Sequence, residues 1–204
     1  MLEFKALSAL LSYPATELRE ALPEIAAVIA GSPLIAPPER NELFALIGEI
    51  GEKDLLAAEE SYVDLFDRGR ALSLHLFEHL HGDGRERGEA MVELKQLYAA
   101  AGFELTARDL PDYLPVVLEY LSHRDIAEAR DMLADCAHIL TAIGRSLVAR
   151  RSRYAAVIQA LLVMAGEQPI DSAKIPAVHE RPEALDHDWA EQPAFSDAAP
   201  RQAG

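Results

Sequence analysis

Apolar residues recur with helical spacing along most of the chain. The spacing i, i+3, i+4 and i+7 places side chains on one face of an α-helix. It is clearest in two runs: Leu43, Leu46, Ile47 and Ile50, and Tyr154, Val157, Ile158, Leu161 and Leu162. No comparable run alternates with the period of two that a half-buried strand shows. The pattern predicts an all-α protein with seven to nine helices.

Prolines and glycines mark the expected helix ends. Pro37 and Pro38 favour a helix start, whereas Gly102 and Gly166 follow apolar runs and favour helix ends. The longest predicted helix runs from about residue 125 to residue 150. One face of it carries the apolar stripe that is expected to meet the core: Met132, Cys136, Ile139, Ile143 and Leu147.

The chain divides into two regions near Pro169. Residues 1–168 carry the helical pattern and are predicted to form a single helical domain. Residues 169–204 contain recurring prolines and scattered acidic residues without an apolar period, so they are predicted to be a disordered C-terminal tail. The tail carries two large aromatic residues, Trp189 and Phe195.

The charge balance narrows the possible partners. The chain has 34 acidic against 19 basic residues, a formal net charge of -15. A phosphate backbone would be repelled by this field, so no nucleic-acid partner is predicted. The same field would attract cationic peptides, and it would also keep any protein soluble. The net charge alone does not decide whether the acidic residues bind cationic peptides or only keep the protein soluble.

Three features predict a cytoplasmic protein that does not insert into a membrane. The single cysteine, Cys136, excludes an internal disulfide and lies among apolar residues, as a buried structural thiol does. The N-terminus lacks the features of a secretory signal. The longest apolar stretch, residues 154–165, is interrupted by Gln159 and is too short to span a bilayer.

Two segments combine aromatic and acidic residues. The first, residues 62–83, reads YVDLFDRGRALSLHLFEHLHGD, and the second, residues 109–121, contains LPDYLP. Asp112 is predicted to be an N-cap that places Pro115 third in the helix, where no intrahelical bond is lost. Aromatic core residues beside a solvated charged face would also explain both segments. No Lys or Arg interrupts the acidic residues that lead into the first segment: Asp54, Glu59, Glu60, Asp64 and Asp67.

The sequence from His75 to His79 has the form H-x-x-E-H, in which two histidines bind zinc and a glutamate, here Glu78, activates water. A metal-dependent hydrolase is therefore the alternative function. A catalytic site needs a third protein ligand, for which His81 and Asp83 are candidates, although a polar rim explains these two residues as well. No other catalytic motif is present. We predict a protein that is not an enzyme and has no cofactor.

Together the two segments resemble the delta-subunit, or NarJ-type, assembly chaperones of respiratory nitrate reductase, over about residues 1–167. The resemblance implies a single helical domain that binds the N-terminal peptide of the apo catalytic (alpha) subunit until the molybdenum cofactor is inserted. In the wider group of redox-enzyme maturation chaperones, a histidine usually follows the aspartate of the second motif. Tyr113 stands there in this chain.

The resemblance and the residue types together predict a peptide-binding groove between two motif-bearing helices, with apolar anchors and an acidic rim. We expect a monomer or a weak homodimer, and a free-standing structural subunit of the reductase remains an alternative. The predicted peptide-binding residues are Tyr62, Asp64, Leu65, Phe66, Asp67, His75, Glu78, His79, Asp112, Tyr113, Leu114, Pro115, Leu118 and Glu119.

Overall fold

The computed structural model describes residues 1–80, 85–106 and 109–177, except for the side chain of Arg85. Within these ranges it contains ten α-helices, of which all but the five-residue α5 have at least nine residues, and it contains no strand. The predicted all-α fold with a single helical domain is confirmed. Residues 178–204, with Trp189 and Phe195, lie outside the described residues.

The elements follow one another in a simple order. The first half of the chain forms α1 (Leu2–Leu10), α2 (Thr16–Gly31), α3 (Pro37–Glu52), α4 (Leu55–Phe66), the 3-10 helix η1 (Arg70–Leu72) and α5 (Leu76–Leu80). The second half forms α6 (Arg85–Ala100), α7 (Leu114–Ser122), α8 (Ile126–Asp135), α9 (Ala137–Ala149), α10 (Ala155–Ala165) and the 3-10 helix η2 (Ser172–Lys174).

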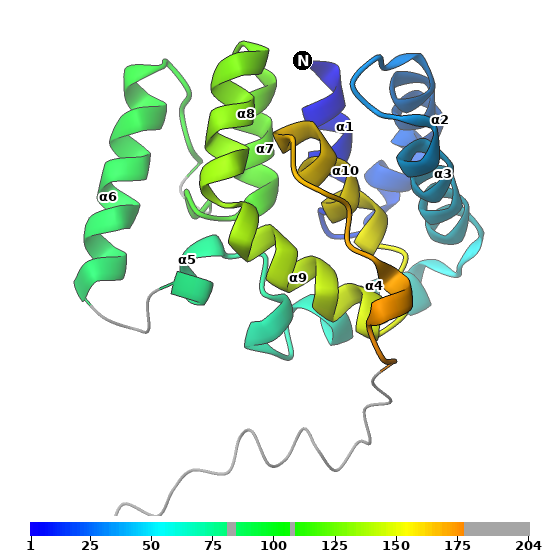
Figure 1. The fold of residues 1–204 in the computed structure, drawn as a ribbon. Coiled ribbons are helices and arrows are strands. Elements are labelled where there is room, and N and C mark those ends of the chain that lie inside the picture. The colour runs from blue at the N-terminus through cyan, green and yellow to red at the C-terminus, as the bar shows by residue number, and fades with distance from the viewer. Residues whose placement is uncertain (81–84, 107–108, 178–204) are drawn as a thin grey trace, which may run out of the picture.

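The apolar helix α10 occupies the centre of the fold, as Figure 1 shows. Its sequence is apolar on almost every side, and seven of its eleven residues are buried. A helix with this composition is stable only when other helices surround it. It packs against α3, α8 and α9. Gly166 ends α10 with a φ of +90°, in agreement with the glycine that the sequence places after this apolar run.

Helix α1 is held against α7, which carries the second motif. The two helices pack together, and α1 also packs against α2. The Ser8 hydroxyl donates to the Pro115 carbonyl at 2.7 Å. The amino group of Met1 donates to the carbonyl of Ser122 at the other end of α7. The two ends of α7 are therefore fixed by the N-terminal helix.

The prediction of one long helix from residue 125 to residue 150 is wrong. The structure has two helices, α8 and α9, which meet at Cys136 with a bend of 69°. A straight helix of 24 residues would be about 36 Å long, whereas the eleven residues of α10 span only about 16 Å. The bend lets both α8 and α9 pack against α10. Cys136 lies at the bend, and burial raises the pKa of its thiol to about 11.

No single helix of the described ranges is both long enough and apolar enough to cross a bilayer. The pair formed by α8 and α9 satisfies the length and composition only when its two bent halves are taken together.

The described part of the predicted tail, residues 169–177, contacts α9 and α10. The Gln159 side chain accepts from the Ile170 N–H at 2.8 Å and donates to the Ile170 carbonyl at 3.0 Å. The Ile170 side chain packs over Gly144, where a Cβ atom would lie 2.5 Å from its Cδ1. The domain boundary at residue 168 stays a prediction.

Candidate functional site

The two motif segments meet through their backbones. Hydrogen bonds of 2.8 and 3.0 Å join residues 74–76 to residues 112–114. They flank an isolated antiparallel bridge between His75 and Tyr113. The bridge immediately precedes α5 and α7. We call this arrangement the motif junction, and its main side chains are Tyr62, His75, Asp112 and Tyr113.

Asp112 is fully buried at the centre of the motif junction. Its Oδ2 accepts a hydrogen bond from the Phe77 N–H at 3.2 Å, and its Oδ1 lies 3.4 Å from Nδ1 of His75. Nη2 of Arg87, on α6, lies 3.9 Å from Oδ2. A carboxylate is tolerated in an interior when hydrogen bonds and cations surround it. Asp112 therefore ties α5, α6 and the start of α7 together.

The prediction that Asp112 is the N-cap of α7 is wrong. The N-cap is Tyr113, whose side chain makes no capping bond, and Pro115 lies second in the helix. The physical reason is the bridge, which holds Tyr113 in an extended conformation and delays the start of α7 to Leu114. The carboxylate of Asp112 instead satisfies a backbone N–H in the first turn of α5.

Tyr113 takes part in a chain of aromatic contacts. Its ring lies 5.1 Å from the ring of His75, and its hydroxyl lies 3.0 Å from the hydroxyl of Tyr62. The Tyr62 hydroxyl also donates to the Leu11 carbonyl at 2.7 Å. Burial raises the pKa of both phenols, most strongly that of Tyr62, to which nearby Tyr113 also contributes. A neutral tyrosine thus connects the motif junction to the aromatic core.

The two histidines of the H-x-x-E-H sequence do not share a helix face. His75 precedes α5 and its Nδ1 faces Asp112, whereas Nε2 of His79 lies 2.9 Å from the Ser73 carbonyl. Among the described residues, no group of three His, Cys, Asp or Glu side chains could hold a metal ion. His81 and Asp83 lie outside those residues. The described geometry does not support the hydrolase alternative.

A pocket of about 480 Å³ lies beside the motif junction, between the end of α4 and the start of α5. Four predicted site residues line it: Phe66, Asp67, His75 and Glu78. We call it the motif pocket. The guanidinium of Arg70, another lining residue, donates to the Glu78 carbonyl at 2.9 Å and 2.5 Å, and the Glu78 carboxylate pairs with Arg87 at 3.2 Å. Asp67, the C-cap of α4, is exposed.

The other predicted site residues lie elsewhere. Leu114 and Leu118 are fully buried, and Pro115 is buried. Leu65 is partly buried against the core. Glu119 is exposed on α7 and does not line the motif pocket. These positions give α7 a packing role in the described structure, and the part that each residue plays in peptide binding stays a prediction.

Asp64 belongs to a second hollow on the outward side of α4. This hollow has a volume of about 380 Å³ and also includes residues that the predicted site did not contain: Tyr13, Leu56, Glu59, Glu60 and Val63. The spacing of these residues in the sequence does indicate that they lie together. Positions 56, 59, 60, 63 and 64 follow the spacing i, i+3, i+4, i+7 and i+8, which places them on one helix face.

The fold and the site define an all-helical protein, in which two motif segments joined by a backbone bridge lie beside a pocket. Residues 12–159 match the family model described as nitrate reductase delta subunit. The chain therefore belongs to this family, the NarJ-type nitrate reductase molybdenum cofactor assembly chaperones.

Relatives that are named as nitrate reductase molybdenum cofactor assembly chaperones align with 78% to 94% of the chain. The nitrate reductase molybdenum cofactor assembly chaperone NarJ of Escherichia coli (strain K12) is 40% identical over 198 residues, which cover 94% of this chain and 84% of the relative. The probable assembly chaperone NarW of the same strain is 35% identical, covering 92% and 80%. The probable NarJ of Bacillus subtilis (strain 168) is 34% identical, covering 78% and 85%.

Proposed function

We propose that this chain is a cytoplasmic chaperone that binds the N-terminal region of the apo catalytic (alpha) subunit of respiratory nitrate reductase. In this role it assists molybdenum cofactor insertion and assembly of the complex. The observation that carries the proposal is the 40% identity, over 94% of the chain, to a protein named for this task. The relatives are named as chaperones and not as catalysts, which supports a role without catalysis or a cofactor of its own.

The motif pocket is our candidate for the place where the client peptide enters. Phe66 supplies an aromatic wall, and the exposed carboxylate of Asp67 lies at the C-terminal end of α4. The helix dipole places partial negative charge at that end, which disfavours a carboxylate there. A cationic client side chain beside Asp67 would relieve this repulsion. The pocket also contains two arginines, but Arg68 pairs with Asp64 and Arg70 donates to the Glu78 carbonyl. Because Glu78 pairs with Arg87, the Asp67 carboxylate is the one that we propose to meet a Lys or Arg of the peptide near an apolar residue.

Reversible binding of a client end is sufficient for a chaperone of this kind. A peptide held by the chaperone cannot dock prematurely on another subunit, and the protected fraction depends on the concentration and affinity of the chaperone. We propose that the chain acts as a monomer or a weak homodimer, and that it leaves when assembly is complete.

The proposal is tested by calorimetric titration of the full chain with the N-terminal peptide of the alpha subunit. We expect binding that weakens as salt rises, and Asp67→Asn should weaken it about threefold at low salt because one cationic contact is lost. The matched control is Asp131→Asn, which neutralises an exposed aspartate on α8. A wild-type chain that does not bind the peptide, or that remains in the purified mature reductase as a structural subunit, would contradict the proposal.

A further inference from the structure

The outward side of α4 forms a groove that is separate from the motif pocket. Its lining residues come from α4, from the segment that follows it and from the turn between α1 and α2: Tyr13, Leu56, Glu59, Glu60, Val63, Asp64 and Arg68. We call it the α4 groove. Of these residues only Arg68 also lines the motif pocket. The opposite face of α4 is buried in the core through Ala58, Tyr62 and Phe66.

The α4 groove presents apolar side chains to solvent. Leu56 is 63% exposed and Tyr13 is 45% exposed, and Val63 is partly buried. A single exposed leucine is ordinary, but two large exposed apolar side chains around one hollow form a surface that another apolar group can cover. Leu56 and Val63 lie seven residues apart, or about 10 Å along the helix. That is the distance between residues i and i+7 of a partner helix.

The groove residue that packs against the aromatic core is Tyr13. Its ring packs edge-on against the ring of Tyr62 at 5.7 Å, so it is backed by the same aromatic core that supports the motif junction. Partial burial and the nearby carboxylate of Glu59 raise the pKa of Tyr13. An anchor that is already ordered loses little side-chain entropy when a partner binds it.

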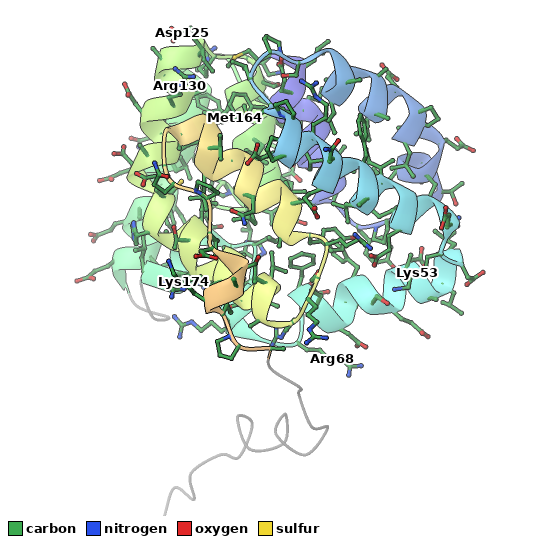
Figure 2. The ribbon with its side chains drawn as sticks, turned by 45° about the vertical axis from the view of Figure 1, so that its right-hand side comes forward. Lys53, Arg68, Asp125, Arg130, Met164 and Lys174 are labelled. Atoms are coloured by element: carbon green, nitrogen blue, oxygen red, sulfur yellow. The ribbon has the colours of Figure 1, made fainter. Side chains whose placement is uncertain are left out.

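The charges of the groove are predominantly negative. Among the described residues that line it, Glu59, Glu60 and Asp64 are acidic and Arg68 is the one basic residue, which pairs with Asp64 at 3.0 Å. Figure 2 shows Lys53 and Arg68, the basic residues that precede and follow α4 in the chain. The ammonium of Lys53 donates to the Ser61 hydroxyl at 2.7 Å beside α4, and Lys53 does not line the groove. Within the described residues, Glu60 forms no ion pair. A cationic partner would therefore find carboxylates along the middle of the helix.

We infer that the α4 groove is a second docking site, which receives an amphipathic helical segment bearing Lys or Arg beside apolar residues spaced i, i+3 or i+4, and i+7. Leu56, Val63 and Tyr13 contact the apolar face of that segment, and Glu59, Glu60 and Asp64 contact its cations. The inference rests on the proposed function in one respect, because it takes this segment to belong to the client subunit.

Arg68 has a specific role in this arrangement. In the free protein Arg68 forms an ion pair with Asp64, and the two side chains are 60% and 56% exposed. An exposed pair of this kind is weak, so an arginine of the partner can replace Arg68 at small cost. Arg68 therefore acts as an internal competitor that sets how strongly cationic a partner must be.

The apolar part of the inference is tested with two labelled probes in fluorescence anisotropy. One is the N-terminal peptide of the alpha subunit, and the other is a designed helix with leucines at i, i+3, i+4 and i+7 flanked by arginines. We expect Leu56→Ser to weaken binding of both probes about tenfold, since one buried leucine is lost from the interface. The matched control is Leu2→Ser, because Leu2 is 65% exposed and lies outside the groove.

The electrostatic part is tested with the double variant Glu59→Gln and Glu60→Gln, and with Arg68→Gln. The double variant should weaken binding about three- to tenfold at low salt and little at 1 M salt, where screening is nearly complete. Glu17→Gln with Glu20→Gln, two exposed positions on α2, is the control. Arg68→Gln should strengthen binding about two- to fivefold because Asp64 is released. Because a general folding defect would not raise affinity, stronger binding by Arg68→Gln could not be explained by misfolding.

The outcomes separate the two proposals. If the α4 groove variants match their controls with both probes, or if neither probe binds the wild-type chain, the docking site is overturned. If the designed helix binds in a manner that depends on Leu56 but the alpha-subunit peptide does not bind, the groove stands and the proposed function fails. The same designed helix with glutamates in place of arginines should not bind, and binding of that version would overturn the electrostatic part.

Discussion

Tyr62 of the motif junction packs against Tyr13 of the α4 groove, and the two regions differ in how their carboxylates are held. Asp112 in the motif junction is fully buried and is surrounded by the Phe77 N–H, His75 and Arg87. Asp64 in the α4 groove has a side chain that is 56% exposed and has only an exposed arginine as its ion-pair partner. Both acids come from segments in which aromatic and acidic residues alternate closely.

The difference shows that segments of similar aromatic and acidic composition can have either a structural role or a recognition role. A buried carboxylate with fixed partners specifies how helices meet, and removing it leaves those partners without compensation. An exposed carboxylate contributes little to folding, so it remains available for an external cation. The motif junction is therefore expected to control stability, and the α4 groove is expected to control recognition.

The largest effect is expected from Asp112→Ala. The change removes the carboxylate that accepts from the Phe77 N–H and that faces His75 inside the fold, whereas Arg87 keeps its pair with Glu78. We expect the free energy of unfolding to fall by about 3 to 5 kcal/mol, which is typical of breaking a buried charged pair. Urea denaturation followed by circular dichroism measures it.

The control for Asp112→Ala is Asp67→Ala in the other motif, where the aspartate is exposed. Its free energy of unfolding should change by no more than about 0.5 kcal/mol. Equal destabilisation by the two changes would remove the distinction between a structural and a recognition carboxylate.

Much of the fold can be predicted from the sequence because helix periodicity and helix ends are local signals. Gly102 and Gly166 both adopt a positive φ, of 73° and 90°, as expected of glycines after helices. The break at Cys136 has no such signal. It arises because α8 and α9 both pack against α10, which is shorter than the single straight helix that the two would otherwise form, and this is a tertiary cause.

The candidate site is less predictable, because periodicity shows which residues share a face but not which face meets the core. On α4 the buried face contains Tyr62 and Phe66, while the outward face contains Leu56. Both faces carry apolar residues, so the spacing alone does not identify the groove. The position of Asp112 is a further case, because an aspartate before Tyr-Leu-Pro looks like an N-cap until its long-range partner in α5 is known.

An intermediate effect is expected from Tyr62→Phe, which removes a hydroxyl placed between the two regions. The hydroxyl donates to the buried Leu11 carbonyl and contacts the Tyr113 hydroxyl. We expect a loss of about 1 to 3 kcal/mol, because a buried acceptor is left unsatisfied. Tyr113→Phe leaves the Leu11 bond intact and should cost less. If Tyr113→Phe were the more damaging of the two, the Leu11 bond would not be the main contribution.

The difference in unfolding free energy between wild type and Tyr62→Phe also depends on pH. Burial raises the pKa of Tyr62 above its ordinary value of 10.0. The native state therefore keeps the phenol proton at pH values where the unfolded chain has lost it. The stability due to this group is fully present below pH 10 and decreases as pH rises further. The difference in unfolding free energy between wild type and Tyr62→Phe should thus narrow in alkaline solution.

The smallest effect is expected from Glu119→Gln, which tests whether exposure alone makes a carboxylate part of the recognition surface. Glu119 is exposed on α7, like Asp64 on α4, but it lines neither the motif pocket nor the α4 groove. The free energy of unfolding should change by no more than about 0.5 kcal/mol. Affinity for the alpha-subunit peptide should also stay within about twofold of wild type, because a single surface charge outside the contact area is screened over about 10 Å at 0.1 M salt.

Calorimetric titration at low and high salt, beside the Glu59 and Glu60 double variant, measures the contrast. A loss as large as that of the double variant would mean that the peptide also crosses α7, and the recognition surface would then extend to the acidic rim predicted on that helix.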